Sequence, residues 1–102
     1  MKRLTPILQA NGFSLISSSA GQLRLSQGTV TRTRWEKTDN YGKTAVVQVR
    51  QVNDAPEVGT LQPGTRRACA NIVSAEDLQK ALDYHGIDII IGIPQMKKGG
   101  DQ

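Results

Sequence analysis

Three arginines in the middle of the chain have a spacing that predicts a shared surface. Arg32 and Arg34 lie two residues apart in one Thr-rich run, and Arg50 lies in the Val-rich run that follows. Both runs are typical of β-strands, in which alternate side chains point to the same face of a sheet. A hairpin that joins the two strands therefore predicts one polar face that carries the three arginines together with Gln48.

Guanidinium groups on such a face are suited to phosphate oxygens, which an arginine contacts through two parallel hydrogen bonds. β-Ribbons enter DNA grooves, and sheets bind single strands of nucleic acid. The leading hypothesis is therefore a small nucleic-acid-associated accessory protein that contacts the DNA or RNA backbone. The candidate nucleic-acid-binding residues are Arg24, Arg32, Arg34, Gln48, Arg50, Arg66 and Arg67.

The charge of the chain is unevenly distributed. Residues 1–67 hold ten Lys and Arg against four Asp and Glu, whereas residues 68–102 hold three against five. A locally basic region favours an anionic partner, because charges act over about a Debye length. The same face also suits an acidic protein surface, which predicts a protein-binding inhibitor or adaptor module as the alternative. A solvated outer sheet face without any ligand is the third interpretation.

The side chains that most often carry catalysis are scarce. His85 is the only histidine and Cys69 is the only cysteine. We interpret His85 as a residue at the end of a helix and Cys69 as a buried thiol. The sequence contains no zinc-ligand spacing, no glycine-rich phosphate loop and no pattern that pairs two carboxylates. We therefore expect a non-enzymatic protein without a cofactor or a metal ion.

Trp35 is the largest of only four aromatic residues. If it were exposed, it would stack on a base or anchor a partner, whereas a buried Trp35 would supply the largest apolar side chain of the core. The scarcity of aromatic residues favours the core. The basic face is accordingly expected to lack the stacked aromatic residues that single-strand-binding sheets carry.

The length and composition predict one soluble, cytoplasmic domain. A chain of 102 residues, of which 37% are hydrophobic, supports one modest core. A single cysteine forms no intrachain disulfide, which favours a reducing compartment. The first residues do not resemble a signal peptide, and the longest apolar run, at 87–93, is too short to span a bilayer.

The elements that position the arginines predict an α+β fold that begins with a short helix. Thr5 is expected as the N-cap, Pro6 as the first helical residue, and Asn11-Gly12 as the stop. An antiparallel β-meander of three to four strands follows. The candidate strands are residues 13–17, 22–26, 29–37 and 43–52.

The position of the second hairpin turn decides which residues share the basic face. A five-residue loop at 38–42 pairs Trp35 with Ala45 and keeps the arginines on one face, whereas a four-residue loop at 39–42 mixes the faces. We favour the five-residue loop because it leaves one apolar and one polar face. The membership of Arg24 depends in the same way on the preceding reversal.

The last third of the chain predicts a helix and a strand. Ser74 and Asp77 form a capping-box pattern, and Gly86 is the expected C-terminal stop. A final Ile-rich strand is expected at 87–93, before Pro94. If one side of this strand is exposed, it offers an edge for a homodimer.

Two segments have no regular pattern. Residues 53–67 contain two prolines and two glycines, and we expect a long loop there. Residues 95–102 are predicted to be a flexible tail. The single domain is therefore expected to span residues 1–94.

Overall fold

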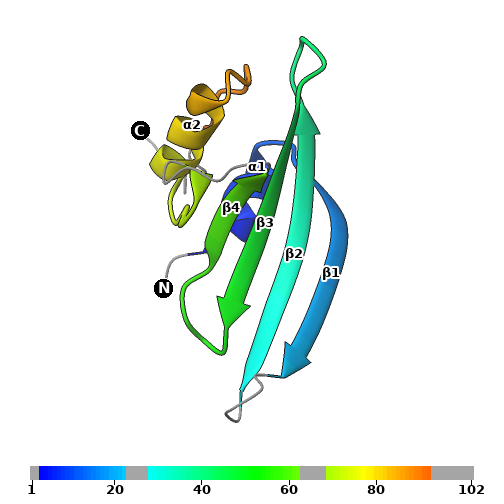
Figure 1. Ribbon diagram of the computed structural model, residues 1–102, viewed down its shortest axis with the longest axis vertical. Helices are drawn as coiled ribbons and strands as arrows, with labels where there is room; N and C mark the ends of the chain where they lie inside the picture. Colours follow the sequence, from blue (N-terminus) through cyan, green and yellow to red (C-terminus); the bar gives the residue numbers. More distant parts are fainter. Residues whose placement is uncertain (1–2, 23–27, 63–68, 93–102) are drawn as a thin grey trace, which may run out of the picture.

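The computed structural model describes residues 3–22, 28–62 and 69–92 and confirms the predicted α+β fold (Figure 1). In chain order, the elements are α1 (Thr5–Ala10), β1 (Ser14–Gln22), β2 (Thr29–Thr38), β3 (Thr44–Val52), β4 (Val58–Gln62) and α2 (Ala75–Tyr84). The strands form an antiparallel sheet in the order β1-β2-β3-β4. Both helices lie towards the β4 side, and one end of the β1–β2 pair extends away from them. Within the described ranges, no helix is long and apolar enough to cross a membrane.

The β2–β3 hairpin defines the two faces of the sheet. Trp35 faces Val47, so the predicted pairing of Trp35 with Ala45 is wrong by two residues. The loop spans 39–43 and not 38–42, because both the end of β2 and the start of β3 lie one residue later than predicted. A displacement by two leaves each side chain on its predicted face, since side chains alternate with a period of two.

Asp39 fixes this loop and is only 8% exposed. Its Oδ1 accepts hydrogen bonds from the N–H groups of Tyr41 and Lys43, both at 2.8 Å, and its Oδ2 accepts one from the N–H of Asp88 at 2.8 Å. The bond from Asp88, assisted by those from Lys43 and Tyr41, holds the pKa of Asp39 below its ordinary value, although burial opposes this effect.

β1 is one continuous strand, so the predicted break at residues 18–21 is wrong. It pairs with β2 along its whole length, with a bulge between Leu15 and Ser17. The Ser-rich centre has a weak intrinsic strand preference, which pairing with the longer β2 overrides. The predicted strand at 22–26 falls largely outside the described residues, as does Arg24.

β4 corrects the predicted loop at 53–67. Residues 58–62 form an edge strand that pairs with β3. Gly59 is part of the packing, because a Cβ atom there would lie 2.5 Å from a methyl group of Leu4. Gly59 also exchanges two backbone hydrogen bonds with Ile72, at 2.7 and 2.8 Å, which cover part of this edge. The part of the predicted loop beyond β4 lies outside the described residues.

The predicted final strand at 87–93 is also wrong over the residues that the structure describes, which form no strand there. The expected alternation is present nevertheless. Ile87 and Ile89 are buried, whereas Asp88 between them is exposed and Ile90 after them is 78% exposed. Because this segment does not join the sheet, it offers no strand edge for the homodimer predicted from it.

Side-chain amides take the place of a neighbouring strand in this last segment. Gln79 on α2 donates to the carbonyl of Ile89 at 3.0 Å and accepts from the N–H of Ile91 at 2.7 Å. Asn11, after α1, bonds both backbone groups of Gly92 at 2.7 Å. A side-chain amide has the same donor and acceptor as a peptide group, so the segment needs no strand partner here.

The start of α1 is held by a distant carboxylate and not by the predicted Thr5 cap. The helix begins at Thr5, one residue earlier than expected, and Leu4 occupies the N-cap position. Glu57 is only 6% exposed. Its carboxylate accepts hydrogen bonds from the N–H groups of Leu4 and Thr5 at 2.7 and 2.9 Å, and from the hydroxyl of Thr5 at 2.9 Å. Burial alone would raise the pKa of Glu57, but the bonds from Thr5, with Arg3 at 3.5 Å, hold it below its ordinary value.

α2 starts and ends at the predicted signals. The hydroxyl of Ser74 accepts the N–H of Asp77 at 3.1 Å. The carboxylate of Asp77 reaches back to the N–H of Val73 at 3.1 Å, one residue before the usual capping-box partner. Gly86 follows the helix with a φ of +68°, which glycine adopts at little cost.

The core lies between the helices and one face of the sheet, and Trp35 belongs to it as predicted. Trp35 is 4% exposed, and its Nε1 donates to the hydroxyl of Thr33 at 2.9 Å. Val47 and Leu61 from the sheet are fully buried. Cys69 is also fully buried, and burial raises the pKa of its thiol.

Candidate nucleic-acid interface

The face of the sheet that points away from the core carries the arginines. β2 contributes Arg32 and Arg34, which are exposed, and β3 contributes Gln48 and Arg50. Arg34 faces Gln48 across the ladder, and Arg32 faces Arg50. We call these four residues, with their neighbours Ser17, Ser19 and Thr60, the outer face.

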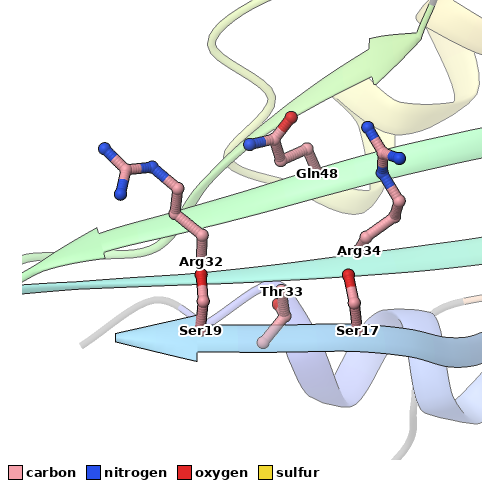
Figure 2. A pocket seen from close by; sticks show the side chains of 6 residues that line it. All are labelled: Ser17, Ser19, Arg32, Thr33, Arg34 and Gln48. Carbon is pink, nitrogen blue, oxygen red and sulfur yellow. The ribbon is translucent and has the colours of Figure 1, made fainter. Parts of the chain in front are cut away.

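The side chains of the outer face extend to the same side of the sheet. Figure 2 shows Gln48 between the side chains of Arg32 and Arg34, with the hydroxyls of Ser17 and Ser19 on the adjacent β1. These five residues and Thr33 line a shallow depression of about 130 Å³. Hydroxyl, amide and guanidinium donors are therefore adjacent on an open surface.

A second depression of about 250 Å³ adjoins the first and shares Arg32 and Gln48 with it. Arg50, Thr60 of β4 and Asn71 complete its polar lining. Asn71 has a φ of +57°, a backbone conformation that asparagine adopts more readily than most residues. Thr60 was missed in the sequence because β4 was interpreted as loop, and Ser17 and Ser19 because β1 was divided. Asn71 was missed because its place beside β4 depends on the bonds between its neighbour Ile72 and Gly59.

The pairing of Arg32 with Arg50 brings two cations directly opposite each other. Like charges at such positions destabilise a sheet. Among the described residues, the one ion pair is that of Arg3 with Glu57, so no described carboxylate pairs with these arginines. Glu36 lies on the same face of β2, two residues beyond Arg34, and forms no ion pair within the described ranges. The arginines of the outer face thus form no ion pair within this part of the chain.

Aromatic side chains do not contribute to either depression. Phe13 and Trp35 are buried, Tyr41 lies in the β2–β3 loop and Tyr84 lies on α2. The outer face therefore offers charge and hydrogen-bond donors without a ring on which a base can stack.

The remaining candidates are placed as follows. Arg24, Arg66 and Arg67 lie outside the described residues. His85 follows α2, where its ring packs edge-to-face on Tyr84 with 5.5 Å between the ring centres. No cluster of three or more metal-ligating side chains occurs in the described part of the chain.

Comparisons with protein-family models, with curated proteins and with solved structures found no match to this chain. Its function must therefore be inferred from the chemistry of the outer face.

Proposed function

We propose that this protein is a non-enzymatic accessory protein that binds the sugar–phosphate backbone of nucleic acid through its outer face. The observation that supports this proposal most strongly is the direct opposition of Arg32 and Arg50, with no described carboxylate paired to either. An arrangement that costs stability in the free protein becomes favourable when an anion lies across both cations.

The spacing of the donors suits a polyanion better than a single small anion. Arg32 and Arg34 are two residues apart on an extended strand, which separates their Cα atoms by about 7 Å. Arg50 adds a third cation on the adjacent strand. A run of phosphates lying across the strands would contact several guanidinium groups in turn, with Gln48 and the serine hydroxyls donating to oxygens between them.

The same chemistry predicts how the binding behaves. Without aromatic residues in its depressions, the outer face offers no ring on which a base can stack, and in this proposal its guanidinium groups contact phosphates. Binding should therefore depend little on sequence and strongly on salt. A cytoplasmic location belongs to the proposal, because a single buried cysteine suits a reducing compartment.

The test is a salt titration of binding to a mixed-sequence duplex and to a mixed-sequence single strand, followed by fluorescence anisotropy. The double variant Arg32→Ala/Arg34→Ala should reduce the slope of log K against log salt concentration by about 1 for each arginine removed. Lys80→Ala is the matched control, since it removes an exposed cation from α2, away from the outer face. It should leave the slope close to that of the parent protein.

Binding that is absent at low ionic strength, or that does not respond to salt, would refute this function. Poly-glutamate then tests the alternative of an acidic protein surface. If poly-glutamate binds and loses affinity in the double arginine variant while both nucleic acids fail to bind, the outer face belongs to a protein-binding module.

A further inference from the structure

β1 is an edge strand whose outer edge has no partner among the described residues. It pairs only with β2 there, and all nine of its residues are exposed. The opposite edge differs, because Gly59 of β4 exchanges two backbone hydrogen bonds with Ile72. Within residues 3–22, 28–62 and 69–92, the sheet thus has one partly covered edge and one open edge.

The hydrogen-bond pattern identifies the backbone groups that point out of the open edge. The N–H of Asp39 donates to the carbonyl of Lys43, and the carbonyl of Thr29 accepts a hydrogen bond from the N–H of Asn53; both partners flank β3. The odd-numbered residues of β2 therefore direct their N–H and C=O groups towards β3. Its even-numbered residues then bond towards β1, where Arg34 faces Ser17 and Arg32 faces Ser19.

It follows that Ser17 and Ser19 bond to β2, while Ser18 and Ala20 direct their N–H and C=O groups outward. These outward groups lie beyond the bulge, in the regular part of β1. A second antiparallel strand that aligns there would find an N–H and a C=O group on every second residue.

The composition of β1 identifies what fits this edge. The strand contains no charged residue and no proline, which are the residues that usually protect an edge from another strand. A second β1 in antiparallel orientation presents the same uncharged sequence and meets no like-charge repulsion. Leu15 and Ile16, 53% and 50% exposed, add apolar surface beside the edge. We propose that two copies of this chain pair through their β1 edges to form one continuous antiparallel sheet.

The paired sheet would also join the two outer faces, an extension that rests on the proposed function. Ser17 and Ser19 of each copy would meet at the centre, flanked by the arginines of the two β2 strands. Three strand spacings, about 14 Å, would separate these β2 strands. Two linked faces bind one polyanion with higher avidity than a single face, so nucleic acid would promote the dimer and the dimer would strengthen nucleic-acid binding.

The test measures self-association without nucleic acid, by sedimentation equilibrium of the full chain from about 10 μM to about 1 mM, a range suited to an interface as small as one strand pair. The parent protein should form a concentration-dependent dimer. Ala20→Pro removes an outward N–H without removing a bond to β2, and should weaken dimerisation at least about tenfold. Ser18→Lys places a charge at the edge, leaves the backbone intact and should have a similar effect.

Gln9→Lys is the matched control, because it adds the same charge on an exposed position of α1, and it should leave the dimer intact. Circular dichroism spectra of all variants establish that they are folded. A parent protein that stays monomeric throughout the range, or a dimer that both edge variants leave unchanged, would overturn the proposal. Since no nucleic acid is present, a dimer that forms normally but binds no nucleic acid refutes only the proposed function.

Discussion

Glu57 and Arg32 are both charged residues near the sheet, and their surroundings differ sharply. Glu57 is 6% exposed and accepts three hydrogen bonds from the start of α1, with Arg3 at 3.5 Å. Arg32 is exposed and faces a second arginine across the ladder. On the covered side, charge is compensated within the chain. On the outer face, no described carboxylate forms an ion pair with the arginines, and the proposed function rests on that difference.

The largest loss of stability should come from a substitution in the core, on the covered side of the sheet. Trp35→Ala removes the largest core side chain, which is 4% exposed, and should lower the free energy of unfolding by about 3–5 kcal/mol. Tyr41→Ala is the control, because Tyr41 is an aromatic residue that is 78% exposed. It should change stability by less than about 0.5 kcal/mol. Chemical denaturation measures both, and equal losses would contradict the division into a covered and an open side.

A second, smaller loss of stability should follow from removing the buried carboxylate of Glu57. Glu57→Ala removes the acceptor of three hydrogen bonds at the start of α1 and should cost about 1–3 kcal/mol.

The parent protein should also lose stability in acid, because the pKa values of Glu57 and Asp39 are lower in the folded state than in the unfolded chain. The unfolded carboxyls, with pKa values of about 4, take up protons first, so the stabilisation is complete above that range and is lost as the pH falls from there through the lower pKa values of the folded state. Denaturation curves from pH 7 to pH 3 should show a shallower decline in Glu57→Ala. An unchanged pH dependence would exclude Glu57 as a source of it.

The smallest change in stability is expected on the outer face, where Arg32 and Arg50 face each other. Arg50→Thr removes the cation opposite Arg32 and should raise the free energy of unfolding by about 0.2–1 kcal/mol. Arg34→Thr removes the same charge from a position that faces Gln48, and should give a smaller gain or none. The difference between the two variants should shrink at high salt, because screening weakens the repulsion. A loss of stability in Arg50→Thr would show that the opposed arginines do not repel.

Much of the fold could be predicted from local chemistry. Ser74 and Gly86 delimit α2, and alternation separates Trp35 and Val47 from Arg32 and Arg34. Alternation determines the face of a side chain but not the register of a hairpin. The pairing of Trp35 was therefore displaced by two residues without any change of face.

The errors arose where tertiary contacts override local pattern. In the sequence, Gly59 is typical of a residue that interrupts a strand. Its place in β4 is explained by the close approach of Leu4 and by the backbone hydrogen bonds with Ile72. The isoleucines after α2 alternate as in a strand, but Gln79 and Asn11 bond their backbone in place of a neighbouring strand. In the candidate site, Thr60 could not be assigned to the outer face, nor Asn71 to the second depression beside it, until β4 was known to pair with β3.

Polar anchoring of the chain after α2 has a consequence for how substitutions are tolerated. Asn11, Asp39 and Gln79 come from the end of α1, the β2–β3 loop and α2, and each bonds the backbone of residues 88–92. Replacing any of them disturbs two separate parts of the molecule at once. A mutational scan should therefore find these three hydrophilic positions as restricted as the aliphatic interior, although their residue types suggest variable surface sites.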